Sequence, residues 1–266
     1  MSGLKPHRAR KRFGQHFLTD PGVIDAIVRA IRPASDDIIV EIGPGRGAIT
    51  APIARHCGHL HAVELDRDLA ARLRYEYAAN ERVTIHESDA LSFDYSELSD
   101  SLRVIGNLPY NISTPLLFHL LDHREAIADM HFMLQKEVVD RMVAEPGSKA
   151  YGRLSIMLGC YLDMEALFDV DRLAFEPPPE VTSAVIRMCP LPPEQTPIRD
   201  MRLLSSIVAT AFSQRRKTLR NALKQVASEE VLVSLQIDPT LRPENVAVSD
   251  WVALANLLAT PGDGTR

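Results

Sequence analysis

Apolar and polar positions between residues 38 and 134 form two kinds of segment. Short apolar runs, such as Ile38–Ile42, have the length and β-branched composition of buried strands. Further strands are expected at residues 60–65, 83–86, 103–105 and 130–134, and helices at residues 48–56, 67–79, 113–121 and 136–144. Ser113 is the expected N-cap of its helix. Strands separated by helices predict an α/β fold, a parallel sheet with helices on both faces.

The pattern changes beyond Tyr151. Residues 175–179 (FEPPP) must be extended, because each proline restricts itself and its predecessor. Residues 181–188 alternate like a strand, which is expected to close the sheet at its edge. Residues 190–197 form a proline-rich linker, and only helical periods follow. We therefore predict two domains, residues 1–192 and a small all-helical domain at residues 193–266.

The composition is that of a globular protein. Of 266 residues, 45% are hydrophobic and 24% are charged, which excludes disordered, collagen-like and coiled-coil chains. Three cysteines (Cys57, Cys160 and Cys189) lack metal-ligand spacing, so we expect reduced thiols, no metal and a cytoplasmic location. No apolar run reaches the roughly 20 residues of a membrane-spanning helix, so no membrane partner is expected.

The net charge of −5 conceals two basic segments. Residues 5–12 carry five cationic residues and residues 201–228 carry six, without an acidic residue in either. Each could be a solvated tail or helix face, but together, on an acidic body, they suggest a surface for a polyanion. No apolar stretch follows the first segment, which argues against a signal peptide.

A glycine-rich turn follows the first predicted strand. Gly43, Gly45 and Gly47 precede a helix, where a ligand can approach the backbone closely. Glu64 ends the next strand, 21 residues after Gly43, where a carboxylate can bind both hydroxyls of a ribose. Asp89 follows the third strand, where it could accept a hydrogen bond from an adenine amino group or merely cap a turn. The pattern suits both a nicotinamide-dependent dehydrogenase and an S-adenosylmethionine-dependent methyltransferase.

The segment Asn107-Leu108-Pro109-Tyr110 favours the methyltransferase. An adenine amino group is a poor nucleophile, because its lone pair is delocalised into the ring. A carboxamide oxygen and a backbone carbonyl that accept its two N–H groups would direct that lone pair toward a methyl group. Proline fixes the loop, and the tyrosine offers a flat face to a base removed from its stack. In isolation, the tetrapeptide would be a turn followed by a core tyrosine.

The motifs together resemble the ribosomal RNA adenine N6,N6-dimethyltransferases over essentially the whole chain. They are RFGQHFL at residues 12–18, EIGPGRG at 41–47, ELD at 64–66, GNLPYNIS at 106–113, FEPPPEVTSAVIR at 175–187 and QRRKTLRN at 214–221. The resemblance implies a Rossmann-like, S-adenosylmethionine-dependent methyltransferase sheet with a small helical RNA-binding domain. Two positions depart from the family pattern. His16 stands where asparagine is frequent, and Glu180 where lysine is frequent.

The resemblance also assigns roles to residues. The catalytic segment is Asn107, Leu108, Pro109 and Tyr110. Phe175 is a candidate either for the second face of the target base or for the core. The expected donor-binding residues are His16, Leu18, Gly43, Gly45, Glu64, Asp89 and Asn107. The expected RNA-binding residues are Arg12, Arg215, Arg216, Lys217, Arg220 and Lys224. On one helix from about Leu203, Arg216, Arg220 and Lys224 would form a phosphate-binding stripe, opposite buried Leu219, Leu223 and Val226.

The implied reaction is the dimethylation of two adjacent adenosines in the 3′-terminal hairpin loop of 16S ribosomal RNA, within the small subunit or its precursor, by a monomer. The sequence leaves three alternatives. One is a large-subunit methylase of the resistance type, and another is the nicotinamide-dependent dehydrogenase. The third is a ribosome-assembly factor that keeps the fold without the chemistry.

Overall fold

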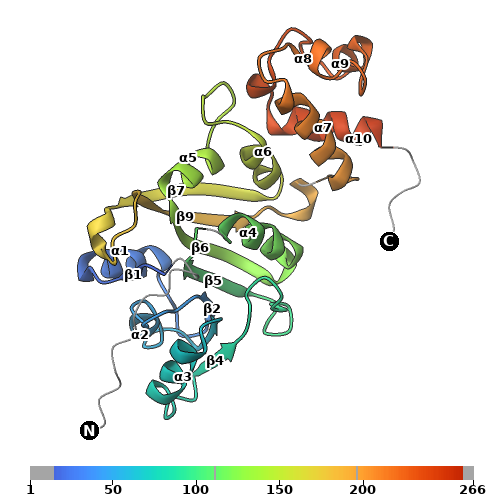
Figure 1. The fold of residues 1–266 in the computed structure, drawn as a ribbon. Helices are drawn as coiled ribbons and strands as arrows, with labels where there is room; N and C mark the ends of the chain where they lie inside the picture. Colours follow the sequence, from blue (N-terminus) through green and yellow to red (C-terminus); the bar gives the residue numbers. More distant parts are fainter. Residues whose placement is uncertain (1–14, 111, 196, 260–266) are drawn as a thin grey trace. The chain divides into compact units, whose positions relative to one another are not determined.

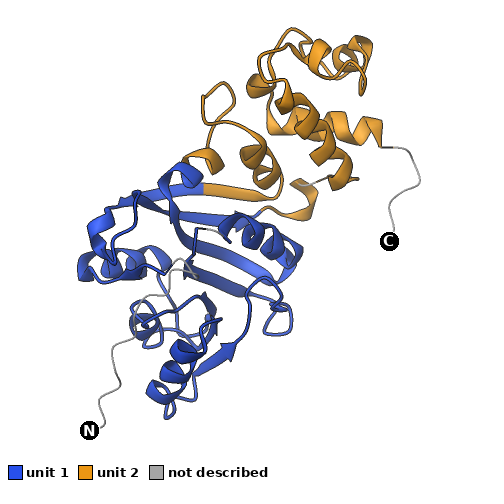
Figure 2. Cartoon of the chain, in the orientation of Figure 1, with its two compact units in different colours: residues 1–139, 165–190 blue, residues 140–164, 191–266 orange. Residues whose placement is uncertain are grey.

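The computed structural model describes residues 15–110, 112–195 and 197–259. The chain forms two compact units, shown in blue and orange in Figure 2. The first comprises residues 1–139 and 165–190, and the second comprises residues 140–164 and 191–266. Residues 140–164 thus group with the C-terminal segment, although the sequence pattern placed them in the N-terminal domain. The assignment of catalysis and RNA binding to separate domains stays a prediction.

The first unit is built on a seven-stranded sheet in the order β4-β3-β2-β5-β6-β9-β7 (Figure 1). Its strands are β2 (Ile38–Ile42), β3 (His59–Glu64), β4 (Val83–Glu87), β5 (Leu102–Asn107), β6 (Ile127–Gln135), β7 (Leu162–Val170) and β9 (Ser183–Pro190). Strands β2 to β6 pair in parallel, and β9 pairs antiparallel with β6. The predicted α/β fold is confirmed, and so is each of the five predicted parallel strands.

Helices lie before, between and after the parallel strands. They are α1 (Pro21–Ile31), α2 (Thr50–Ile53), α3 (Arg67–Glu76), α4 (Ser113–Asp122) and α5 (Lys136–Met142), with 3-10 turns η2 (Arg124–Ala126) and η3 (Arg172–Ala174). Ile39 and Ile105 pack with α1 and α2 in one apolar cluster. The alternate positions Val40 and Val104 are also fully buried. Since successive side chains of a strand point to opposite faces, both faces of the sheet are covered.

The strand order reverses between β2 and β5. From β2 the chain proceeds outward through β3 to β4, and then returns to β5 on the other side of β2. Such a switch point opens a crevice at the carboxyl ends of the two central strands. The glycine turn and Asn107 both lie at these ends, so the topology brings together segments about 60 residues apart.

A second, two-stranded sheet joins the start of the described chain to the triple-proline segment. β1 (Phe17–Leu18) pairs antiparallel with β8 (Phe175–Glu176). Phe175 is buried in the apolar cluster with Leu18. The pairing therefore fixes residues 16–18 beside the large sheet.

The prediction of an edge strand at residues 181–188 was wrong in its position. This strand is β9, and it lies between β6 and β7. The edge strand is β7, which the sequence pattern did not predict. Its residues, LDMEALFDV, are rich in Leu, Met, Glu and Ala, which favour helices. Buried and exposed side chains do not alternate regularly along it either. Pairing with the sheet therefore overrides the helical preference of these residues.

Two helix predictions also need correction. Ser113 is the first residue of α4 rather than its N-cap, which is Ile112, and the Ser113 hydroxyl donates to the carbonyl of Tyr110. The helix after the glycine turn is only α2 (Thr50–Ile53), instead of a helix extending to residue 56. The glycines before it have positive φ angles, so the backbone up to residue 47 has turn conformation.

The second unit is helical apart from the first residues of β7. Its helices are α6 (Arg153–Gly159), α7 (Met201–Ser213), α8 (Leu219–Ala222), α9 (Glu229–Ser234) and α10 (Val248–Leu258), with 3-10 turns η4 (Pro193–Gln195) and η5 (Pro243–Asn245). Leu204, Ile207, Trp251 and Leu254 form buried positions of α7 and α10. The predicted all-helical C-terminal region is confirmed over the residues from 198 onward that the structure describes.

The predicted continuous helix through residues 203–226 is wrong. α7 ends at Ser213, and the chain turns before Thr218, which precedes α8 in extended conformation. No apolar residue between Phe212 and Leu219 could anchor a continuous helix in the core. Arg216, Arg220 and Lys224 are exposed but do not form a stripe on one helix. Leu219 and Leu223 are buried as expected, and Val226 is half-buried.

A partly buried ion network lies at the amino end of the large sheet. Arg103 donates Nε and Nη2 to the two carboxylate oxygens of Asp129, at 3.0 and 2.9 Å, and Nη1 to Asp37 at 2.7 Å. His131 on the neighbouring strand is 3% exposed. Neither of its ring nitrogens has a hydrogen-bond partner among the described residues. Burial lowers the pKa of His131 from 6.5 to about 4, against the attraction of Asp129.

This histidine should make folding stability pH-dependent. Since its pKa is lower in the folded state, the unfolded chain binds more protons, and stability decreases as the pH falls from about 6.5 toward 4. The decrease amounts to at most about 3 kcal/mol at the acidic end. We expect His131→Leu to reduce the difference in urea midpoint between pH 7.5 and pH 5. His56→Leu, at an exposed position, is the control and should leave that difference unchanged. An unchanged pH dependence in His131→Leu would contradict this origin.

Candidate active site

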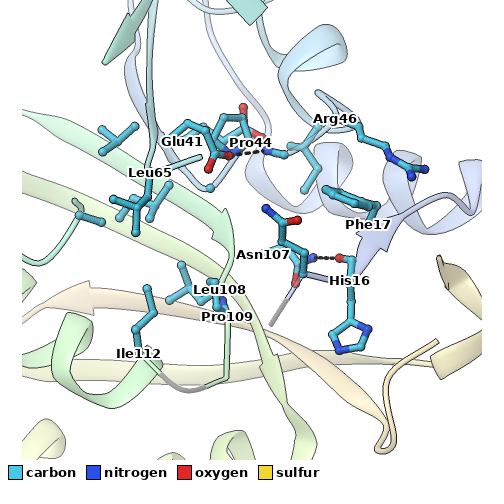
Figure 3. A pocket seen from close by; sticks show the side chains of 18 of the residues that line it. His16, Phe17, Glu41, Pro44, Arg46, Leu65, Asn107, Leu108, Pro109 and Ile112 are labelled. Atoms are coloured by element: carbon cyan, nitrogen blue, oxygen red, sulfur yellow. Dashed lines mark hydrogen bonds between the residues drawn. The ribbon is translucent and has the colours of Figure 1, made fainter. Parts of the chain in front are cut away.

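A pocket of about 160 Å³ lies at the carboxyl ends of β2, β3 and β5. Ten residues predicted to bind the donor or to act in catalysis line it. They are His16, Leu18, Gly43, Gly45, Glu64, Asp89, Asn107, Leu108, Pro109 and Tyr110. Figure 3 shows His16, Phe17 and Arg46 on one side of this pocket and Leu65 and Ile112 on the opposite side. The fold thus gathers these residues, which separate segments of the chain provide.

The glycine turn opens the pocket at the end of β2. Gly43 and Gly45 have φ angles of 65° and 59°, which glycine adopts without strain. A Cβ on Gly45 would lie 3.2 Å from the ring of Phe17. The turn is fixed from two sides, because Gly43 N–H donates to the carbonyl of Val63 and Gly45 N–H donates to Glu64. At Gly43 and Gly45, therefore, the bare backbone faces the ligand space.

Glu64 is held rigidly at the end of β3. Its Oε2 accepts the N–H of Gly45 at 3.1 Å, and its Oε1 accepts the N–H of Asp66 at 2.9 Å. Burial raises the pKa of Glu64, and these backbone hydrogen bonds oppose the rise. Each carboxylate oxygen can accept more than one hydrogen bond. The side chain therefore suits two adjacent hydroxyls, as a ribose presents them.

Glu41 lines the same pocket and was not among the predicted donor-binding residues. It is 2% exposed, and its Oε2 has no hydrogen-bond partner among the described residues. Burial raises the pKa of Glu41 to about 7, and the charge of Glu64 adds to the rise. A buried acceptor without a partner is costly unless a ligand supplies a donor. The signal in the sequence was a charged residue inside the otherwise apolar strand IIVEI.

Asp89 fits both interpretations that the sequence allowed, because it caps a turn and also borders the pocket. Its Oδ1 accepts the N–H of Leu91 at 2.9 Å, which caps the turn after β4. The residue also lines the pocket, together with Ser88 and Ala90. The turn thus positions a carboxylate beside the ligand space.

The Asn107 side chain is oriented by the N-terminal strand. Its Nδ2 donates to the backbone carbonyl of His16 at 3.0 Å, as Figure 3 shows. This bond fixes the amide plane and identifies Oδ1 as the acceptor of the group. Two backbone hydrogen bonds support the segment that follows: Leu108 N–H donates to the carbonyl of Met133, and the Pro109 carbonyl accepts the N–H of Ile112.

The rings of Tyr110 and His16, which both line the pocket, face each other. Their ring centroids are 6.0 Å apart and their planes differ by 24°. Tyr110 shares a hydrogen bond of 3.0 Å with the hydroxyl of Ser183, and His16 Nδ1 donates to the carbonyl of Pro177 at 2.8 Å. Phe175 is 3% exposed and does not line the pocket, so it is a core residue here.

The basic residues of the second unit surround the start of α8. Arg216, Lys217, Arg220 and Lys224 are exposed, whereas Arg215 is half-buried. Arg215 has a structural role, because it pairs with Glu244 at 3.6 Å and donates to the carbonyl of Lys149. Arg220 lies 3.8 Å from Glu229. Arg12 lies outside the described residues.

The described part of the chain contains neither a metal cluster nor a membrane-spanning helix. Residues 15–110, 112–195 and 197–259 hold no group of three or more His, Cys, Asp or Glu side chains arranged to bind a metal ion. In the same ranges, no helix has the length and apolar character needed to cross a membrane.

Comparison with known proteins decides the family. A family model described as "Ribosomal RNA adenine dimethylase" matches residues 6–260. The chain belongs to this family. The protein is therefore a dimethylase that methylates adenine in ribosomal RNA with S-adenosylmethionine as methyl donor. The dehydrogenase interpretation of the glycine turn is wrong.

Curated relatives of this dimethylase match it over nearly their whole length. A protein of Aromatoleum aromaticum, named "Ribosomal RNA small subunit methyltransferase A", is 57% identical over 256 residues, 96% of each chain. A protein of Bordetella pertussis with the same name is 55% identical over 97% of each chain. A solved structure, a dimethyladenosine transferase from Plasmodium falciparum, has a TM-score of 0.78 and 26% identity, covering 90% of this dimethylase and 96% of that chain.

The pocket of the dimethylase fits its donor. The glycine turn leaves room for a ligand against the backbone, and Glu64 presents paired acceptors. Glu41 adds a buried carboxylate whose Oε2 has no protein partner among the described residues, and a donor with an ammonium and a sulfonium supplies the matching positive charge.

Proposed function

We propose that this dimethylase acts on the small ribosomal subunit. It transfers methyl groups to the N6 atoms of two adjacent adenosines in the 3′-terminal hairpin loop of 16S ribosomal RNA, in the subunit or its precursor. The observation that carries the proposal is the identity of 52–57% with relatives named for the small subunit. The proposal also has the protein act as a monomer in the cytoplasm and without a metal ion.

The proposed donor site extends from β4 to β1. Asp89 accepts the adenine amino group, Glu64 binds the ribose hydroxyls, and the turn at Gly43 and Gly45 lies beneath the donor. His16 and Leu18 border its methionine side. Bound S-adenosylmethionine supplies an electrophilic methyl group on a positively charged sulfur. The pocket supports this arrangement because one continuous cavity contacts all of these residues.

The proposed role of Asn107 follows from its orientation. With Nδ2 bonded to His16, Oδ1 accepts one N–H of the target amino group. The Leu108 carbonyl, in the catalytic segment that the family resemblance implies, accepts the second N–H, and Leu108 lines the same pocket. Tyr110 supports the target ring by stacking. The lone pair of N6 then attacks the methyl carbon, the bond from carbon to sulfur breaks, and the amino group releases a proton to solvent.

No strong general base is required in this proposal, because the N–H becomes acidic once N6 carries the new methyl group. Catalysis then depends on alignment and on neutral acceptors placed before the reaction. The exposed cations near α8 bind RNA phosphates without reading the sequence. Selection comes from a single-stranded loop whose adenine can reach the pocket.

The test is to map labelled methyl groups after incubation of the protein with ribosomal subunits from cells that lack it. Small subunits should incorporate methyl groups at two adjacent adenosines near the 3′ end, and large subunits should incorporate none. Labelling confined to large subunits would contradict the proposal and favour a methylase of the resistance type. Binding to small subunits without any labelling would favour the assembly factor.

A further inference from the structure

Arg46 is the exception to the acidic character of the pocket. Three carboxylates line the pocket, those of Glu41, Glu64 and Asp89. Of the described residues that line it, Arg46 is the one with a permanent positive charge. None of the roles assigned to the donor site uses this side chain, so the proposed donor site does not yet account for the arginine.

Arg46 is held at the pocket by the ring of Phe17. Its guanidinium carbon lies 4.3 Å from the ring centroid, which is a cation–π distance. The Arg46 side chain is 29% exposed. Phe17 itself packs against the glycine turn and belongs to β1. The stacking therefore helps to position the guanidinium at the pocket.

Glu176 is the ion-pair partner of Arg46. Its Oε2 lies 2.7 Å from Arg46 Nη1, and its side chain is 67% exposed. An ion pair so open to solvent contributes little net free energy, because water solvates the carboxylate almost as well. Glu176 is thus a partner that a better-placed carboxylate can replace.

We propose that Arg46 binds the α-carboxylate of S-adenosylmethionine and exchanges Glu176 for it. This inference rests on the proposed function, because it takes the donor's methionine side to lie at His16 and Leu18. Those residues flank Phe17, so the guanidinium above that ring borders the same end of the pocket. A planar guanidinium matches a carboxylate with two parallel N–H donors, and it presents five N–H groups in all.

The exchange connects donor binding to the segment that faces the target. Glu176 lies in β8 and precedes Pro177, whose carbonyl accepts His16 Nδ1. When Arg46 turns to the donor, Glu176 is released to solvent at the start of the triple-proline segment.

The experiment compares two ligands by calorimetry on the full-length protein. Decarboxylated S-adenosylmethionine keeps the adenosine, the sulfonium and the amine, and it lacks only the carboxylate. Arg46→Leu should raise the Kd of S-adenosylmethionine about tenfold and leave that of the decarboxylated ligand unchanged. Glu176→Gln should lower the Kd of S-adenosylmethionine about two- to threefold, because it removes the competitor. Arg67→Leu is the matched control, since Arg67 also pairs with a glutamate, Glu87, outside the pocket.

Each outcome of this experiment either supports or overturns the proposed exchange. The opposite effects of Arg46→Leu and Glu176→Gln, both restricted to the ligand with a carboxylate, would establish the exchange. An equal weakening of both ligands in Arg46→Leu, or of neither, would overturn carboxylate binding by Arg46. A weaker donor affinity in Glu176→Gln would overturn the competition. A native protein that binds neither ligand would instead refute the proposed function, and the exchange with it.

Discussion

Replacing Asn107 with alanine should abolish methyl transfer while the protein still binds the small subunit. The change removes the Oδ1 acceptor for the target amino group and also the Nδ2 bond to His16. Removing one preorganised polar group of this kind typically costs on the order of 10²–10³-fold in kcat. We expect at least that decrease in a labelled-methyl assay at saturating donor. Binding of small subunits, measured by filter retention, should remain within about twofold, because an uncharged side chain neutralises no phosphate.

Two further variants make this result specific. Asn107→Asp keeps an acceptor oxygen but replaces the N–H that faces the His16 carbonyl, so it should also lose most activity. Asn80→Ala removes an amide that only caps a turn at Arg82, away from the pocket, and should retain native turnover. Retention of turnover in Asn107→Ala would count decisively against the mechanism.

Reversing the charge of Arg216, Lys217 and Lys224 should weaken binding of the small subunit without changing donor affinity. All three side chains are exposed, so their replacement by glutamate leaves the core intact. Arg215 is left in place, because its bonds to Glu244 and Lys149 support the unit itself. We expect the Kd for small subunits to rise more than tenfold at about 0.1 M salt. The slope of log K against log salt should fall by about one for each phosphate that the variant no longer neutralises.

A matched triple variant distinguishes a specific surface from a change in total charge. Arg29, Arg55 and Arg67 are exposed cations of the first unit, outside the pocket. Their reversal to glutamate changes the net charge by the same amount. If this control weakened subunit binding equally, the surface around α8 would have no special role. A parallel decrease of donor affinity in the first variant would indicate misfolding instead.

The central strands and the glycine turn could be predicted because local and global signals agree there. Ile38–Ile42 is apolar and β-branched, it is buried on both faces, and a glycine turn follows at once. β7 could not be predicted, because its helix-favouring residues form a strand only by pairing at the edge of a finished sheet. The break between α7 and α8 has a similar cause. The helical spacing of cations was real, but no apolar residue supports a helix through residues 214–218.

In the candidate site, too, the sequence predicted what local signals determine and missed what long-range contacts determine. Glu64 and Asp89 could be placed at strand ends from the sequence, since their segments read clearly as strand followed by turn. Neither the bond from Asn107 to His16 nor the pair of Arg46 and Glu176 could be foreseen. Each joins residues more than 90 positions apart, through the short pairing of β1 with β8. Phe175 was a candidate for the target site until the same pairing placed it in the core.

The hydrogen bond from Asn107 to the backbone of His16 limits how far the enzyme can be truncated at its N-terminal end without loss of catalysis. The amide that aligns the reaction takes its orientation from a segment outside the large sheet. A fragment that began at α1 would keep every strand of that sheet and the glycine turn. Its asparagine would rotate freely, so such a fragment could retain the architecture of a methyltransferase and yet be a poor catalyst.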